Sequence, residues 1–238
     1  MHCHMSDLDI ALCDASIGDT PAERNFRREV DASLTAFKLS VDEQPPWPTA
    51  DGEWAYDAAV ITGSQTAVYD HETWMETLAE LLRDLHELDI PLLGVCWGHQ
   101  FIAQTFGGCV SAMDEYELGY QQIERYDSSP LFADFPAEFI AFETHSDEVV
   151  RLPPNATELA GNSRSCQAFS LGTAYGVQFH PEYDLKTVKM VTDGKREEGV
   201  SESVVETVLT SATPSQHTKT QTAKRVFENF LSIVEQHQ

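Results

Sequence analysis

At 238 residues, 42% of them hydrophobic, the chain is long enough for one globular domain with a large core, and no apolar run reaches the length of a membrane span. It has 39 acidic and 15 basic side chains, a formal net charge of −24 and no basic patch, which disfavours direct binding to nucleic acids. Such a surface repels itself in dilute salt and is screened at molar salt, so the charge indicates either a halophilic cytosol or an ordinary solvated acidic surface.

The first half of the chain predicts alternating strands and helices. Three short segments are predicted as strands: residues 8–13, 35–41 and 56–61. Two segments with helical patterns are predicted as helices: residues 20–33 and 72–88. The first helix is expected to begin with a capping box, with Thr20 as N-cap, Pro21 in the first turn and Glu23 completing the box. The alternation predicts an α/β fold with a doubly wound, mostly parallel sheet and helices on both faces, whose active site lies beyond the carboxyl ends of the strands.

A continuously apolar segment, residues 90–95, predicts a strand buried on both faces, and it ends at Cys96. A helix is predicted after it, and small residues flank the cysteine as Gly94 and Gly98, which is the form of a nucleophile elbow. At such a turn the thiol lies at the positive end of a helix, which favours the thiolate, and the N–H of Trp97 is free to donate to an oxyanion. The alternative is a buried cysteine that acts as a small hydrophobe.

Another apolar strand, residues 175–179, ends in His180, and Glu182 follows two residues later. A cysteine nucleophile needs a base, and the base needs an acid that orients it. His180 and Glu182 fit these two roles if the ends of the two strands are neighbours in the fold. The alternatives are a structural histidine at the end of a strand and a solvated carboxylate in a loop.

Two motifs, Gly94-Val95-Cys96-Trp97-Gly98-His99-Gln100 and Gly176-Val177-Gln178-Phe179-His180-Pro181-Glu182, resemble those of the class I (triad) glutamine amidotransferases. The resemblance covers nearly all of residues 8–183 and is greatest to the amidotransferase subunit of GMP synthase and to stand-alone relatives, including γ-glutamyl peptidases. It implies a flavodoxin-like sheet with a small antiparallel extension. It also implies hydrolysis of the glutamine side-chain amide through a γ-glutamyl thioester on Cys96, with release of ammonia.

The resemblance also implies where the second oxyanion donor lies. In the family this donor is in the loop after the third strand, usually within Gly-Gly-Pro, and the matching residues here are Gly63-Ser64-Gln65. The N–H of Ser64 is therefore expected to act together with that of Trp97, and Gly63 to contact the substrate. Ser64 departs from the family pattern, and a serine lacks the tolerance of glycine for positive φ. The Gly-Ser form of this loop is more similar to the stand-alone and γ-glutamyl peptidase branch. The alternative is a simple tight turn.

Further substrate contacts are carried over from the family motif. Gln100 is implied to contact the substrate, and His145 and Ser146, within Thr144-His145-Ser146, to line the glutamine pocket. The alternative for His145 is a turn histidine capped by Asp147.

The second half of the chain predicts an antiparallel extension and a closing helix. Four short segments are predicted as strands: residues 117–123, 138–142, 158–160 and 167–170. We expect a single domain over residues 1–238 with a core at 7–183. Residues 184–222 are expected to be an insertion or flexible segment, with a loop or partly disordered linker at 210–221. Apolar residues at helical spacing predict an amphipathic closing helix within 223–236.

The five cysteines, at positions 3, 13, 96, 109 and 166, are odd in number and scattered, which favours reduced thiols in the cytoplasm. The first seven residues contain no apolar signal-peptide core, and we expect His2-Cys3-His4 to be a disordered terminus rather than a metal site. The expected mechanism needs no metal and no organic cofactor. No phosphate-binding motif is present to activate an acceptor with ATP, so ammonia would pass to a synthetase subunit in trans.

Three hypotheses for function remain open at the level of sequence. The first is a glutaminase subunit that feeds a separate synthetase, such as the XMP-aminating half of GMP synthase. The second is a stand-alone hydrolase of γ-glutamyl amides or peptides, and the third is a catalytically idle interaction protein that kept the fold. The complete set of Cys96, His180 and Glu182 argues against the third hypothesis, whereas the first two share every motif.

Overall fold

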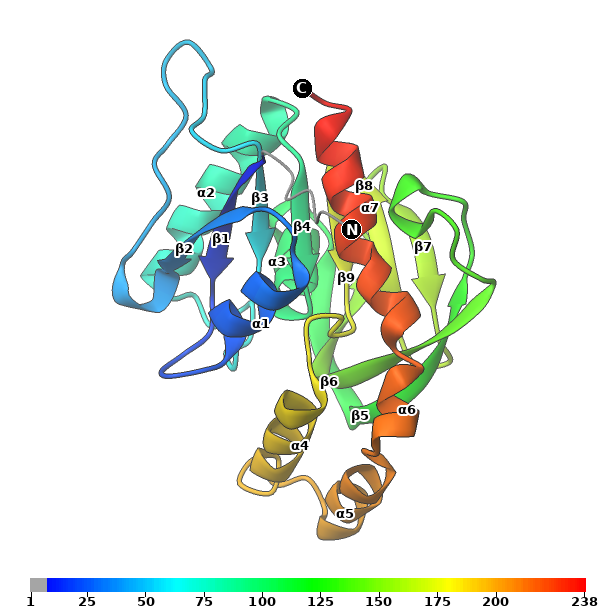
Figure 1. Cartoon of the computed structure of the whole chain (residues 1–238). Coiled ribbons are helices and arrows are strands. Elements are labelled where there is room, and N and C mark those ends of the chain that lie inside the picture. Colours follow the sequence, from blue (N-terminus) through cyan, green and yellow to red (C-terminus); the bar gives the residue numbers. More distant parts are fainter. Residues whose placement is uncertain (1–7) are drawn as a thin grey trace.

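The computed structural model describes residues 8–238, so the His2-Cys3-His4 segment lies outside the described residues. One sheet of nine strands has the order β2-β1-β3-β4-β9-β8-β7-β5-β6 (Figure 1). The strands are β1 (Asp9–Asp14), β2 (Ser33–Lys38), β3 (Ala58–Ile61), β4 (Leu92–Val95), β5 (Cys109–Arg125), β6 (Glu138–Arg151), β7 (Thr157–Gly161), β8 (Cys166–Leu171) and β9 (Ala174–Val177). The helices are α1 (Ala22–Glu29), α2 (Thr73–Glu87), α3 (Trp97–Thr105), α4 (Leu185–Gly194), α5 (Glu202–Ser211), α6 (Pro214–Thr218) and α7 (Gln221–Glu235), with 3-10 turns at Leu39–Val41 and Pro130–Phe132.

Half of the sheet is parallel and half antiparallel. The strands β2, β1, β3, β4 and β9 pair in parallel, and β8, β7, β5 and β6 continue the sheet in antiparallel pairs. The predicted parallel sheet with an antiparallel extension is confirmed, and the long strands β5 and β6 make this extension larger than the sequence suggested. Because β4 and β9 are neighbours, with Gly94 opposite Gly176, the chain segments that follow them leave the sheet side by side.

Helices cover both faces of the parallel half, as predicted (Figure 1). On one face, Phe26 of α1 and Phe227 of α7 pack with sheet residues such as Leu12. On the other face, Leu82 of α2 and Ile102 of α3 pack against the opposite side of the same strands. Each face buries a continuous apolar cluster, which is the main source of stability for a sheet of this kind. No helix within residues 8–238 is long and apolar enough to cross a membrane.

The predicted capping box at the start of the first helix is wrong. The helix α1 begins at Ala22 and its N-cap is Pro21, which makes no side-chain capping bond. The hydroxyl of Thr20 lies 2.6 Å from that of Ser16, which ties the helix entry to the loop after β1, and it also accepts from the N–H of Ala22 at 3.4 Å. The helix is also shorter than predicted, since it ends at Glu29 where Val30 becomes extended. The second strand is displaced as well, because β2 ends at Lys38 and its predicted last residues form a 3-10 turn.

The loop or linker predicted at 210–221 is also wrong, because this segment contains the end of α5, all of α6 and the first residue of α7. The helices α4 and α5 lie together at one end of the molecule, next to β5 and β6 (Figure 1). Val208 and Ala212 of this region form a small apolar cluster with Leu118 of β5 and Phe142 of β6. This contact orders a segment whose polar composition resembles that of a linker.

Candidate active site

Cys96 occupies a sharp turn between β4 and α3, with φ 55° and ψ −106°. A positive φ is uncommon for a residue with a side chain, and it persists where the surrounding structure imposes it. Here a Cβ on Gly94 would lie 2.3 Å from the carbonyl oxygen of Gly98, and one on Gly98 would lie 2.4 Å from that of Ile61. Only glycine at both positions allows β3, β4 and α3 to approach this closely. The turn therefore has the geometry of a nucleophile elbow.

His180 and Glu182 follow β9, the neighbour of β4, and both are buried. Nδ1 of His180 lies 2.8 Å from Oε1 of Glu182, and the imidazole stacks on the ring of Tyr183 with centroids 4.1 Å apart. A Cβ on Gly63 would lie 3.3 Å from Cε1 of His180 and 3.7 Å from Cβ of Cys96, so both side chains border the same small space. The structure thus brings the thiol, the imidazole and the carboxylate together from two neighbouring strand ends.

The electrostatics of the site favour a charged imidazole. Burial lowers the pKa of His180, but the charges of Cys96 and Glu182 and hydrogen bonds to them outweigh this effect and raise the pKa to about 10. A histidine with such a pKa is an imidazolium at neutral pH and is a suitable partner for a thiolate. The arrangement can therefore hold a thiolate–imidazolium pair.

A cavity of about 530 Å³ opens in front of Cys96. Its lining includes Gly63, Ser64, Thr144 and His180, together with residues of α4 and of the turn after it. Neither Gly63 nor Ser64 has a positive φ, so serine fits this loop without backbone strain. Trp97 is the first residue of α3, directly after the nucleophile, and its indole is buried against Phe101 at a centroid distance of 4.5 Å. The loop and the helix N-terminus thus both lie next to Cys96, where the expected oxyanion donors belong.

Three residues predicted to bind substrate do not line this cavity. The amide of Gln100 is buried and donates to the carbonyl of Asp147 at 2.8 Å and to Oε1 of Gln178 at 3.0 Å. Ser146 is exposed. His145 is buried within β6 rather than in a turn, and its Nδ1 lies 2.8 Å from the carbonyl oxygen of Asp147. Direct substrate contact by these three residues stays a prediction.

His145 lies between two buried carboxylates that the sequence did not single out. Its Nε2 is 3.1 Å from Oε2 of Glu117 and 3.4 Å from Oε2 of Glu143, and both glutamates are almost fully buried. Burial lowers the pKa of His145, but these carboxylates outweigh it and raise the pKa to about 10, whereas burial raises the pKa of Glu143 to about 7. An alternating strand that carries glutamates usually exposes them to solvent, so local sequence held no signal for this cluster.

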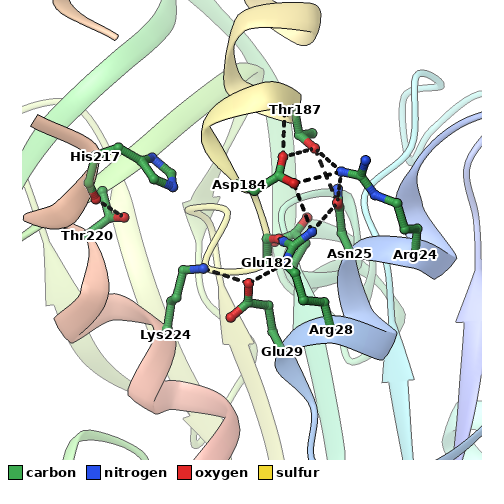
Figure 2. Close-up of polar contacts among 10 residues, drawn as sticks. All are labelled: Arg24, Asn25, Arg28, Glu29, Glu182, Asp184, Thr187, His217, Thr220 and Lys224. Carbon is green, nitrogen blue, oxygen red and sulfur yellow. Dashed lines mark hydrogen bonds and ion pairs between the residues drawn. The ribbon is translucent and has the colours of Figure 1, made fainter. Parts of the chain in front are cut away.

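A network of polar side chains fixes the segment that carries Glu182 (Figure 2). Arg28 of α1 donates a short hydrogen bond to the backbone carbonyl of Glu182, and its guanidinium lies 3.1 Å from Oδ2 of Asp184. Asp184 is the N-cap of α4, accepting from the N–H of Thr187 at 2.7 Å, and it also pairs with Arg24 at 3.0 Å. Helix α1 therefore holds both the loop of Glu182 and the start of α4.

Replacing Arg28 with methionine is expected to lower kcat for the reaction at Cys96 by about tenfold, with a smaller change in KM. The substitution removes the hydrogen bond that fixes the backbone of Glu182, so His180 loses part of its orientation. Steady-state kinetics of the variant, with thermal melting to verify folding, measure this effect. Arg24→Met is the matched control, because Arg24 shares Asp184 with Arg28 but donates to the side chains around it rather than to the backbone of Glu182. Equal losses of kcat in both variants would contradict the positioning role of Arg28.

Comparison with known proteins gives a family match. A family model described as class I glutamine amidotransferase matches residues 23–192. One subunit of the glutamine-hydrolysing GMP synthase from Pyrococcus abyssi is 38% identical over 107 residues, which cover 43% of this chain and 56% of the relative. The glutamine-hydrolysing GMP synthase from Chlorobium chlorochromatii is 36% identical over 134 residues, which cover 52% of this chain and 25% of the relative. The matches therefore span between a quarter and little more than half of the curated relatives' length.

Solved structures agree with the fold over almost the whole chain. The crystal structure of a glutamine amidotransferase from Thermotoga maritima has a TM-score of 0.75 at 21% identity, covering 93% of this chain and 97% of the solved one. That of a glutamine amidotransferase from Methylobacillus flagellatus has a TM-score of 0.78 at 21% identity, covering 95% of each chain. At this level of identity the likeness establishes the architecture.

Proposed function

The chain belongs to the class I glutamine amidotransferase family, and from that premise we propose that it hydrolyses the side-chain amide of glutamine and supplies the ammonia to a separate synthetase, as in GMP synthases. One observation carries the proposal: Cys96, on its elbow, borders the same cavity as the hydrogen-bonded pair of His180 and Glu182. The similarity to curated GMP synthases supports the choice of synthetase. We further propose one cytoplasmic domain in which residues 184–222 are an insertion into the family core.

In the proposed mechanism, the thiolate of Cys96 attacks the carboxamide carbon of glutamine and forms a tetrahedral oxyanion. The N–H groups of Ser64 and Trp97 donate to this oxyanion. Removing one such donor typically raises the activation barrier by about 2.7–4 kcal/mol. His180, oriented by Glu182, gives its proton to the leaving nitrogen, so ammonia departs and the γ-glutamyl thioester remains. A water molecule, deprotonated by His180, then cleaves the thioester and releases glutamate and the thiolate.

A stand-alone γ-glutamyl peptidase is the second candidate. The Gly63-Ser64 sequence in place of Gly-Gly favours it, as does a cavity of about 530 Å³, which has room for a substrate larger than glutamine. The two candidates share the nucleophile, the base and the acid, and they differ in the leaving group that the site accepts.

Steady-state kinetics of the isolated protein test the choice, with glutamine and a γ-glutamyl dipeptide as competing substrates in high salt. A glutaminase that feeds a synthetase is expected to turn over glutamine slowly alone, and addition of the synthetase with its acceptor should raise kcat more than it lowers KM. Fast hydrolysis of the dipeptide, with glutamine a poor substrate, would replace the amidotransferase proposal by the peptidase.

We also propose that the net charge of −24 is an adaptation to high salt. Mutual repulsion of the acidic side chains opposes folding in dilute salt, and molar salt screens it, so the thermal midpoint is expected to rise by several degrees from low to molar potassium chloride. Melting curves at several salt concentrations measure this. A midpoint that is unchanged or falls with salt would assign the acidic surface to another cause.

A further inference from the structure

Lys195 is a cation in an otherwise acidic part of the active-site cavity. It follows the last residue of α4 and lines the same cavity as Cys96 and His180. Among the described residues that line this cavity it is the one lysine or arginine, whereas Asp19, Glu182, Glu197 and Glu198 also line it. In a chain with only 15 basic side chains, a lysine at this position calls for a functional explanation.

The ammonium group of Lys195 is held in place by Glu198 and lies over the ring of Tyr116. Its Nζ lies 2.8 Å and 2.7 Å from the two carboxylate oxygens of Glu198, and 5.2 Å from the ring centroid of Tyr116. The side chain of Lys195 is 13% exposed, whereas that of its partner Glu198 is 51% exposed. The lysine is thus an internal cation of the cavity wall, and its counter-ion faces water.

Contacts connect this ammonium group to the nucleophile. The hydroxyl of Tyr116 lies 3.0 Å from that of Thr144, and the carbonyl oxygen of Thr144 lies 4.0 Å from Sγ of Cys96. Thr144 also lines the cavity. Although burial acts against the charge of Lys195, Tyr116 and Glu198 raise its pKa, so the group is an ammonium at neutral pH. The ammonium group of Lys195 is therefore connected to Cys96 through Tyr116 and Thr144.

We propose that Lys195 binds the α-carboxylate of the γ-glutamyl substrate and that Glu198 binds its α-ammonium group, which makes the turn after α4 a specificity-determining subsite. The inference rests on the proposed function and adds the residues that recognise the head group. A free α-amino acid carries one charge of each sign. When it separates Lys195 from Glu198, each of the four charges gains a new partner and none is left unpaired.

The subsite lies outside the stretch that the family model matches. The family model ends at residue 192, whereas Lys195 and Glu198 lie beyond that match. Glutamine and γ-glutamyl peptides share the same head group, so the subsite serves either substrate. Compounds that keep the amide but lack one of the two head-group charges are therefore the ligands that reveal it.

The test compares kcat/KM for glutamine, for 4-aminobutanamide, which lacks the α-carboxylate, and for glutaramate, which lacks the α-amino group. The wild-type protein is expected to prefer glutamine over 4-aminobutanamide by about 10- to 100-fold, as a charge-assisted hydrogen bond would give. Lys195→Met, which keeps an unbranched side chain over Tyr116, should bring this preference close to one by slowing glutamine alone. Glu198→Gln should instead reduce the preference over glutaramate. Lys189→Met is the matched control, since Lys189 is exposed on the same helix and outside the cavity lining.

Equal losses on glutamine and 4-aminobutanamide in Lys195→Met, or an unchanged preference, would overturn the subsite while leaving the proposed function intact. A wild-type protein that hydrolyses no γ-glutamyl compound would instead overturn the proposed function. The subsite is then tested without turnover, by calorimetric titration of glutamine and 4-aminobutanamide into the wild-type and Lys195→Met proteins. A preference for the carboxylate-bearing ligand that disappears in Lys195→Met supports the subsite, and equal affinities in both proteins reject it.

Discussion

Replacing Cys96 with alanine is expected to reduce hydrolysis of glutamine and γ-glutamyl substrates to the background rate, a loss on the order of a million-fold. In the proposed mechanism the sulfur forms the thioester, and no other cysteine within the described residues lines the cavity. Alanine keeps the Cβ, so the backbone strain at φ 55° is unchanged and stability is expected to shift by less than about 1 kcal/mol. Initial rates and thermal melting of the purified variant measure the two effects.

Cys109→Ala is the matched control, because Cys109 is a free, exposed thiol at the start of β5. It should keep wild-type activity. A covalent glutamine analogue should label Cys96 in the wild-type protein, and peptide mass spectrometry locates the label. Residual turnover in Cys96→Ala close to the wild-type rate, or a label on another residue, would reject the mechanism.

The parallel half of the fold was predictable because its signals are local. Short apolar strands alternate with amphipathic helices, and in such a topology the carboxyl ends of neighbouring strands meet at one edge of the sheet. That rule placed Cys96 at the edge of the sheet where the active site was expected, whereas the approach of His180 was only a condition of the prediction and follows from the pairing of β4 with β9. Small residues around the cysteine were an equally local signal, since the backbone at Gly94 and Gly98 leaves no room for a side chain.

Other features depend on tertiary contacts that a single sequence does not display. Glu117 and Glu143 are buried around His145, although glutamates on alternating strands usually face solvent. The helices in residues 184–222 are ordered by packing of a few residues such as Val208 against the long antiparallel strands, while their composition is that of a linker. Thr20 fits the N-cap pattern, but the N-cap is Pro21, one residue later, and the hydroxyl of Thr20 bonds Ser16 as well as the N–H of Ala22. In the first two cases a long-range partner overrides the local preference, whereas the partner of Thr20 is only four residues away in sequence.

Glu182→Gln is expected to lower kcat by roughly 10,000-fold, the size of the loss when the orienting acid of a catalytic triad is neutralised. The amide is nearly the same size as the carboxylate but no longer supplies the charge that lies 2.8 Å from Nδ1 of His180. Burial lowers the pKa of His180, and the charges of Cys96 and Glu182 together raise it to about 10. Loss of one of these charges lowers the pKa, so His180 loses its proton at a lower pH than in the wild-type protein.

The direction of the pH effect follows from which form of His180 is active. In the proposed mechanism the imidazolium form, present below the pKa, pairs with Cys96 and donates a proton to the leaving nitrogen, and above the pKa both functions are lost. The alkaline limb of the kcat/KM profile should therefore move to lower pH in Glu182→Gln, and profiles of the two proteins measure the displacement. Glu228→Gln, on the exposed side of α7, is the matched control and should keep the wild-type profile. A variant with reduced kcat but an unmoved alkaline limb would mean that Glu182 orients His180 without holding its proton, because orientation alone leaves the pKa of the imidazole unchanged.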